Sequence, residues 1–173
     1  MIRVPAPVLR RLRARAERAM AARAPDFVVG GTENPYLLRW HGLRRNAVGN
    51  VYLHDFRRDD DDRALHDHPW PSLSICLAGM MRETYAPRSI WVRPGDDPRD
   101  PALHRTRVVA AGDVVWRGPR FAHRLEVVAR PALTLFLTGP RVREWGFWCP
   151  QGFRPWQQFV APDDKGDIGR GCE

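Results

Sequence analysis

The stretch that decides the fold is residues 65–70, which read LHDHPW and place His66 and His68 one residue apart. On a β-strand, residues two positions apart point to the same face, so both imidazoles can reach one metal ion. A third histidine, His123, ends the stretch 112–123, which reads GDVVWRGPRFAH and lies between two further strand-like runs. The spacing predicts that three histidines meet inside a β-structure.

Short strand-like runs dominate the chain after residue 35. Gly, Pro, Asn or Asp bounds each run, and this spacing is typical of all-β sandwiches and barrels. The expected strands are Tyr36–Trp40, Gly49–Phe56, Leu73–Ala78, Met81–Tyr85, Ser89–Val92, Thr106–Ala110, Asp113–Arg117, His123–Val128, Leu133–Thr138 and Glu144–Trp148. Two acidic or proline-rich interruptions, residues 59–62 and 94–101, are expected to form surface loops.

The N-terminal segment has a helical pattern. Between residues 7 and 24, apolar residues recur every three or four positions and arginines fill many of the others. We expect an amphipathic helix that packs on the outside of the domain and covers an opening of the barrel. The sequence predicts a basic helical segment at 1–30, one barrel domain at 31–160 and, because apolar residues become rare, a flexible tail at 161–173.

The composition favours one globular domain with a small-molecule partner. A chain of 173 residues that is 43% hydrophobic can bury a core of its own. Its formal net charge of +8 would suit nucleic acid, because phosphate contacts come from clustered Lys and Arg. However, only one of the 28 basic residues is a lysine, Lys165. This arginine bias runs through the whole chain, so nucleic-acid binding is not expected.

The cysteines and the hydropathy indicate a cytoplasmic protein. Cys76, Cys149 and Cys172 are far apart and have no C-x-x-C spacing, so we expect neither a disulfide framework nor a zinc ribbon. A reducing compartment fits this pattern. No run of about 18 apolar residues occurs, and the N-terminus is rich in arginine, so neither a membrane span nor an export signal is expected.

The histidine stretches resemble the two motifs of the cupins. The matching residues are His66, His68 and Gly79 in the first motif and Gly112, Asp113, Pro119 and His123 in the second. Ser72 stands where the first motif has a glutamate ligand, and Pro119 is one place closer to His123 than in the family pattern. The resemblance implies an all-β fold, a cupin-type antiparallel β-barrel (jelly roll) with an N-terminal α-helix, and a metal bound inside it.

Among cupins, the chain is most similar to the cysteine dioxygenase-like thiol dioxygenases, which bind iron through three histidines and also lack the glutamate. The similar stretches are 66–68 (HDH), 77–79 (LAG), 82–84 (RET), 123–126 (HRLE) and 131–135 (PALTL). The similarity implies an Fe(II) dioxygenase acting on a small anionic thiol or carboxylate. Thr138 stands where those enzymes have a tyrosine, and their carboxylate-binding arginine could be matched by Arg44 or Arg45.

The donor chemistry agrees with a catalytic metal. Three neutral imidazoles suit Fe, Zn, Ni, Mn or Cu, and three protein ligands leave coordination positions open. The candidate substrate contacts are Arg45, Trp70, Ser72 and Arg120. Asp67 is expected to point away from the site and pair with an arginine. Glu83 is expected to face solvent unless the strand bends at Gly79. The other histidines, His41, His54 and His104, are expected to have ordinary structural roles.

Two alternatives to the dioxygenase hypothesis remain. One is a non-catalytic, ligand-binding cupin. The other is a metal-free isomerase of the sugar-nucleotide type, in which an inward histidine acts as a base. The dioxygenase hypothesis requires bound metal and oxygen consumption, and the ligand-binding hypothesis requires neither. The isomerase hypothesis requires turnover in the presence of a chelator. Cupins often pair, so a homodimer is also expected.

Overall fold

The computed structural model describes residues 2–60, 64–87, 97, 99–161 and 169–173. It contains one long helix, α1 (Ala6–Ala21), a single-turn helix, α2 (Trp156–Phe159), and a 3₁₀ turn, Pro101–Leu103. The strands are β1 (Ile2–Arg3), β2 (Phe27–Val29), β3 (Leu37–His41), β4 (Asn50–Phe56), β5 (Leu65–His66), β6 (Ser72–Tyr85), β7 (Arg105–Ala110), β8 (Asp113–Arg117), β9 (His123–Thr138), β10 (Gly146–Cys149) and β11 (Gly152–Pro155). The predicted all-β class with an N-terminal helix is confirmed.

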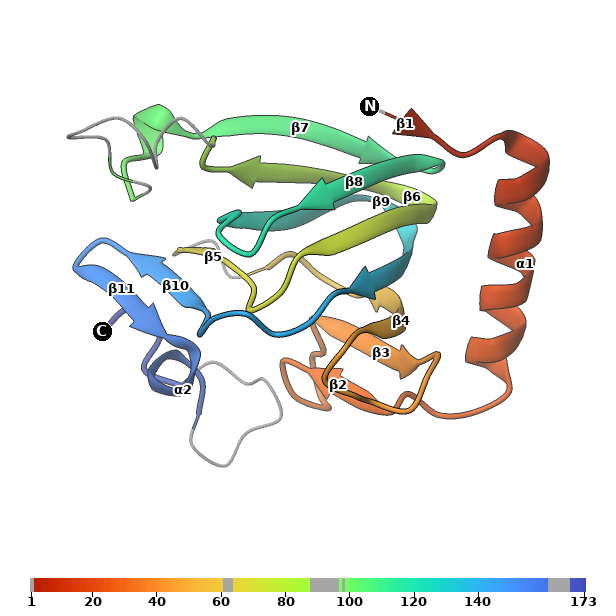
Figure 1. Cartoon of the computed structure of the whole chain (residues 1–173), viewed down its shortest axis with the longest axis horizontal. Helices are drawn as coiled ribbons and strands as arrows, with labels where there is room; N and C mark the ends of the chain where they lie inside the picture. The colour runs from red at the N-terminus through yellow and green to blue at the C-terminus, as the bar shows by residue number, and fades with distance from the viewer. Residues whose placement is uncertain (1, 61–63, 88–96, 98, 162–168) are drawn as a thin grey trace.

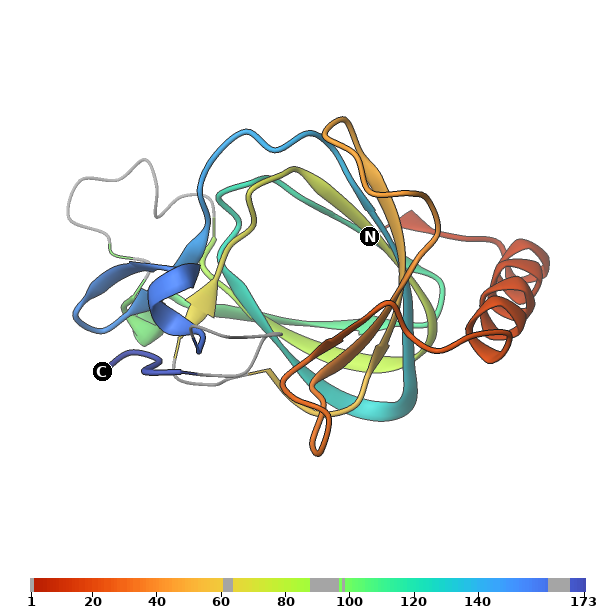
Figure 2. The ribbon, with the colours of Figure 1, turned by 90° about the horizontal axis from the view of Figure 1, so that it is seen from below.

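The strands form one antiparallel sheet that curls into a barrel, as Figures 1 and 2 show. Its main order is β1-β8-β6-β9-β4-β3-β2; β7 also pairs with β6, and β5 joins β9 to the hairpin of β10 and β11. The long strands β6 and β9 were each expected to be two strands. They pair with each other along most of their length, so they form the centre of the sheet.

A β-bulge bends β6 at Gly79. The pairing of β6 with β9 shifts between Cys76 and Met81, and Gly79 has a φ of 77°. A Cβ at this position would collide with the carbonyl oxygens of Ala129 and Pro131, so only glycine fits. Because one residue is added to the alternation, the side chains that point inward change from even-numbered to odd-numbered positions along β6.

Side chains of the sheet alternate between the cavity and the outer surface. On β4 and β9, His54 and Phe136 line the cavity, so Leu53 and Leu135 point outward. These outward residues pack against apolar residues of α1, which are Leu9, Leu12, Ala16 and Met20. The helix therefore covers the outer face of the sheet, as Figure 2 shows, and not an opening of the barrel as predicted.

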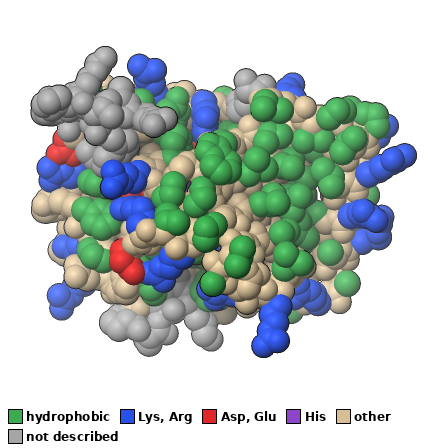
Figure 3. Space-filling model, in the orientation of Figure 1, with side chains coloured by type: hydrophobic (Ala, Val, Ile, Leu, Met, Phe, Trp, Pro, Cys, Tyr) green, Lys and Arg blue, Asp and Glu red, His purple; other side chains and the backbone are tan. Residues whose placement is uncertain are grey.

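Part of this outer face is not covered by α1. Leu73 and Trp116 are directly opposite each other on β6 and β8, and Trp116 is 64% exposed. Figure 3 shows hydrophobic side chains gathered on this side of the molecule, beside the helix. This apolar surface lies outside the barrel and is separate from the cavity.

Several elements differ from the sequence prediction. The helix ends at Ala21, three residues before the predicted end. The strands β1, β2, β5 and β11 have only two to four residues each, which is too short for a periodic pattern. The predicted strand Ser89–Val92 lies outside the described residues. Within the described part of the chain, no helix is long and apolar enough to span a membrane.

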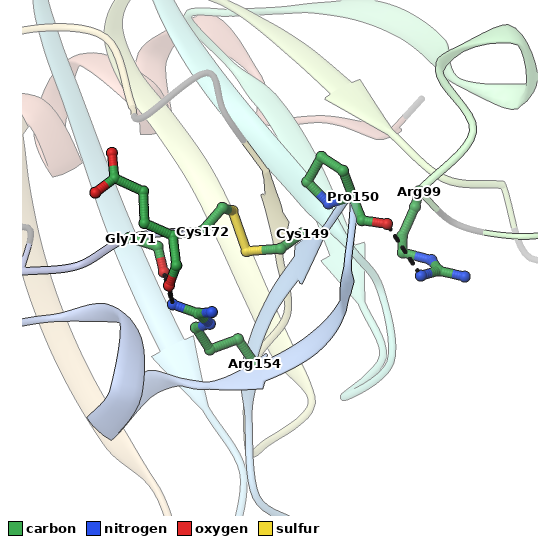
Figure 4. The surroundings of a disulfide bond; sticks show 7 residues. Arg99, Cys149, Pro150, Arg154, Gly171 and Cys172 are labelled. Atoms are coloured by element: carbon green, nitrogen blue, oxygen red, sulfur yellow. Dashed lines mark hydrogen bonds between the residues drawn. A yellow bond between two sulfur atoms is a disulfide. The ribbon is translucent and has the colours of Figure 1, made fainter.

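A disulfide joins the end of the chain to β10. Cys149 and Cys172 are bonded, as Figure 4 shows, so the prediction that no disulfide forms is wrong. The residues are 23 positions apart, but the N–H of Gly171 donates to the carbonyl of Phe159 and folds the terminus back. Cys172 is buried. The last residues of the tail, predicted to be loose, therefore lie against the barrel, whereas 162–168 lie outside the described residues.

Candidate metal centre

The three histidines predicted to bind a metal converge beside β5. His66 lies directly opposite His123 of β9, and His68 follows two residues later. One nitrogen from each ring lies within 4.8 Å of the other two, and the Nε2 atoms of His68 and His123 are 3.0 Å apart. The ring centroids are separated by 4.9 to 5.2 Å. The structure thus brings all three candidate ligands together.

This arrangement fits one divalent ion. Imidazole nitrogens lie about 2.1 Å from such an ion, so two nitrogens on the same ion can be about 3 Å apart. The Nε2 atoms of His68 and His123 have this separation. Three protein nitrogens also leave positions open for a substrate, whereas a structural zinc site is closed by four ligands. The donor set therefore suits a catalytic metal.

Two carboxylates lie at the outer nitrogens of the cluster. Nδ1 of His123 is 2.6 Å from Oε1 of Glu83, and Nδ1 of His66 is 3.0 Å from Oδ2 of Asp60. A carboxylate beside Nδ1 favours the tautomer that carries its proton on this nitrogen and leaves the lone pair on Nε2. Both rings are therefore oriented with the metal-binding nitrogen toward the shared space.

The protonation of the three rings differs. Burial lowers the pKa of His68 well below its usual value, and burial lowers the pKa of His123 to about 4 although Glu83 opposes this effect. Burial alone would also lower the pKa of His66, but the Asp60 carboxylate raises it above the usual value. His68 and His123 are thus neutral at neutral pH, and His66 is the ring at which a proton competes most with a metal.

Glu83 is held by two arginines as well as by His123. Its side chain is fully buried, with Nε of Arg117 2.6 Å from Oε1 and Nε of Arg107 2.5 Å from Oε2. Arg117 also donates to Oγ of Ser74 over 2.9 Å. Burial alone would raise the pKa of Glu83, but Arg117 and His123 hold it well below its usual value. The carboxylate is therefore ionised at neutral pH.

The prediction that Glu83 faces solvent is wrong, and the reason is the bulge of β6. On an unbroken strand, Glu83 would point to the opposite side from Ser74, which lines the cavity. The extra residue at Gly79 reverses the alternation and turns Glu83 toward His123. The glycine was the sequence signal, but its effect depends on the pairing of β6 with β9.

Asp67 has the structural role that the sequence predicted. Asp67 lies between His66 and His68 in the sequence, and its side chain is buried. Its Oδ2 lies 2.6 Å from Nη1 of Arg143. Its Oδ1 accepts the N–H of Gly146 over 3.1 Å. Burial raises the pKa of Asp67, although Arg143 opposes this effect. The pair connects the histidine stretch to the segment that leads into β10.

The histidines open into a cavity of about 470 Å³. Apart from the histidine cluster, its polar lining includes Arg39, His54, Ser74, Arg117 and Thr134. Aromatic residues form the wall beside the cluster: Phe136, Trp145, Phe147 and Trp156. Among the described residues, the indole N–H groups of Trp70 and Trp156 have no hydrogen-bond acceptor. A ligand oxygen in the cavity could therefore accept from them.

Arg39 lines the cavity together with Arg58 and Arg117, and no sequence motif indicated it. Its Nε donates to Nε2 of His54 over 3.0 Å, and its guanidinium lies 5.0 Å from the ring centroid of Tyr52. Burial lowers the pKa of His54 well below the usual value, so this histidine is a neutral acceptor. No carboxylate pairs with Arg39 in the part of the chain that the structure describes. Its charge is available to an anionic ligand.

The predicted substrate contacts are divided between the cavity and the surface. Trp70 lines the cavity. Ser72 is buried on β6 but does not line it. Arg45, like Arg44, is exposed in the loop between β3 and β4, and Arg120 is exposed in the turn before His123. Arg45 was predicted from the resemblance to thiol dioxygenases and Arg120 from its position beside His123, but neither lines the cavity.

No protein-family model and no curated protein matches the sequence. Solved structures similar to this one include a cupin superfamily protein from Desulfitobacterium hafniense, with 13% identity over 60% of this chain and 77% of that chain and a TM-score of 0.43. An RmlC-like cupin from Shewanella frigidimarina has 14% identity over 66% and 85% of the two chains and a TM-score of 0.44. Oxalate decarboxylase from Bacillus subtilis has 12% identity over 79% of this chain and 31% of its own and a TM-score of 0.48.

Proposed function

We propose that this protein is a metal-dependent oxidoreductase that binds one divalent ion, Fe(II) before other metals, through His66, His68 and His123. The observation that carries the proposal is the position of Asp60 and Glu83 at the outer nitrogens of two of the rings. A buried carboxylate is costly without a partner, and carboxylates in this position commonly orient metal-bound imidazoles. The resemblance to thiol dioxygenases supports iron and dioxygen chemistry.

The surroundings of the cluster favour a small anionic substrate. Iron bound there would supply dioxygen activation and a binding position for the substrate. Three neutral imidazoles leave the charge of a divalent ion uncompensated, so a thiolate or carboxylate would balance it. Aromatic rings shield this region from water: Phe147 lies 5.8 Å from His66 and Trp145 lies 6.4 Å from His68, measured between centroids.

Arg39 is the residue that we assign to the acidic group of the substrate. It lines the same cavity as the histidines, and a guanidinium binds a carboxylate through charge-assisted hydrogen bonds. His54 fixes its orientation by accepting from Nε, which leaves the terminal nitrogens for the ligand. Arg39 thus takes the role for which the sequence offered Arg44 or Arg45.

Elemental analysis by mass spectrometry tests the proposed metal centre. Untagged protein loaded anaerobically with Fe(II) should hold near-stoichiometric iron, and a variant with all three cluster histidines changed to alanine should lose it. His104→Ala is the matched control, because His104 is outside the cluster. The loaded protein should then consume dioxygen when small thiols or carboxylic acids are added in an oxygen electrode.

Two outcomes would contradict the proposal. A wild-type protein that binds no metal after loading would leave a ligand-binding barrel, or a metal-free isomerase if sugar-nucleotide turnover continued with a chelator present. Stoichiometric metal without oxygen consumption on any thiol or carboxylic acid would retain the metal site and remove the oxidoreductase activity.

A further inference from the structure

The cavity is larger and more apolar than a substrate of amino-acid size requires. Its volume is about 470 Å³, within the range of about 300–1,000 Å³ typical of sites for larger organic ligands. Five apolar residues from five different strands both line it and pack together as one cluster: Leu37, Phe56, Met81, Val109 and Leu125. They form a continuous apolar wall that the metal cluster does not use.

The charged groups of the cavity lie on other residues. They include three arginines and the carboxylate of Asp60. Arg39 donates to His54, Arg58 donates to the backbone carbonyl of Asn34, and Arg117 pairs with Glu83. None of the five residues in the apolar wall carries a polar side-chain group. A ligand that fills the cavity must therefore combine an acidic group with an apolar body.

We propose that the natural ligand is an amphiphilic acid, with a carboxylate at Arg39 and a medium-length alkyl or aryl body against Leu37, Phe56, Met81, Val109 and Leu125. A substrate as small as cysteine would leave this wall in contact with water, which is unfavourable. The inference deepens the proposed function by naming the substrate class. However, the cavity carries it independently of the metal, so it can be tested on metal-free protein.

Calorimetry with a series of straight-chain carboxylates tests the ligand class. Metal-free protein would be titrated with acetate, hexanoate and decanoate, and with hexylamine and decylamine as charge controls. Each added methylene should tighten binding by up to about fourfold until the cavity is full, and the carboxylates should bind more tightly than the amines. Absence of decanoate binding, equal affinities along the series, or equal binding of the amines would overturn the proposal.

A matched pair of substitutions on β7 tests where the apolar body lies. Val109 is 1% exposed and lines the cavity, whereas its neighbour Val108 is 50% exposed on the outside. Val109→Phe should fill the apolar end and weaken decanoate binding at least tenfold while hexanoate binding changes less. Val108→Phe should leave both affinities unchanged. Equal decanoate binding by the two variants would contradict the assigned position.

A second variant and a metal measurement keep the test decisive. If Val109→Phe fails to fold, as judged by circular dichroism, Leu125→Phe narrows the same wall from β9 and should give the same loss. Decanoate binding without metal binding would remove the oxidoreductase proposal and retain the amphiphilic acid. Metal binding without any dependence of carboxylate affinity on chain length would retain the oxidoreductase proposal and remove the amphiphilic acid.

Discussion

Of the three arginines that line the cavity, Arg39, Arg58 and Arg117, the first and the last have contrasting surroundings. Arg117 is 3% exposed and has a carboxylate partner, with its Nε 2.6 Å from Oε1 of Glu83, and it also donates to Ser74. Arg39 has the neutral ring of His54 as its hydrogen-bond partner and no carboxylate partner among the described residues. The first arginine is used within the protein, and the second is available to a ligand.

The difference between Arg117 and Arg39 shows that one cavity can hold an arginine that supports the protein itself and an arginine that can bind a ligand. The charge of Arg117 is balanced by Glu83, and Glu83 in turn orients His123, so this group supports the candidate metal ligands. The charge of Arg39 is balanced only when an anion enters. We therefore expect substitutions at Arg117 to affect stability and substitutions at Arg39 to affect ligand binding.

The largest expected effect is on the stability of Arg117→Met. This change removes one of the two guanidinium groups that pair with the fully buried carboxylate of Glu83, and breaking a buried pair in this way costs about 3–5 kcal/mol. Arg39→Met removes a charge that has no carboxylate partner among the described residues and loses the hydrogen bond to His54, so it should cost only about 0.5–1.5 kcal/mol. Urea unfolding at neutral pH measures both. Equal destabilisation would mean that the two arginines have the same role.

The next effect is on metal affinity. Glu83→Gln keeps the shape of the side chain but removes the charge that supports Nδ1–H of His123, and loss of such a partner weakens metal binding about 10–100-fold. Asp60→Asn should act in the same direction through His66. Competition with a chelating dye measures the affinity. Glu126→Gln is the control, since Glu126 pairs with Arg82 at the surface, and an equal loss there would contradict the role of Glu83.

The sequence predicted the parts of the site that depend on local geometry. His66 and His68 share a face because they are two residues apart, and Asp67 points the other way for the same reason. The position of His123 came from resemblance to a motif. These residues lie where they were expected because each prediction needed only a short strand and an antiparallel partner.

The remaining parts depend on pairing between distant segments. Asp60 belongs to an acidic run that was read as a surface loop, but its carboxylate contacts His66. Glu83 needs the bulge at Gly79 to turn inward. The disulfide requires the terminus to fold back over α2. Neither periodicity nor motif spacing contains this information, because each contact is set by the register of strands far apart in the chain.

Ligand binding separates Arg39 from the arginine that the sequence favoured. Arg39→Met should weaken decanoate binding at least about tenfold, because charge-assisted hydrogen bonds contribute about 1.5–3 kcal/mol. Arg45→Met should leave the affinity unchanged, since Arg45 is exposed and does not line the cavity. Calorimetry on both variants decides between them. A loss confined to Arg45→Met would place the acidic group of the ligand at the loop.

The smallest expected effect is a pH dependence of the stability gap between wild type and Glu83→Gln. The pKa of Glu83 is held well below its usual value by Arg117 and His123, although burial opposes them. In the unfolded chain a glutamate titrates at about 4.3. A lowered folded-state pKa stabilises the protein above the unfolded pKa, and this stabilisation is lost as the pH falls toward the folded pKa.

The gap should therefore be constant near neutral pH and narrow below about pH 4.3, where the wild type gains a proton on unfolding that the glutamine side chain of the variant cannot take up. Other carboxylates titrate in both proteins and cancel in the difference. Urea unfolding at neutral and acidic pH measures the gap, with Glu126→Gln as the exposed control. A gap that widens on acidification would mean that Glu83 is protonated in the folded protein, and Arg117 would then lack the ionised partner that distinguishes it from Arg39.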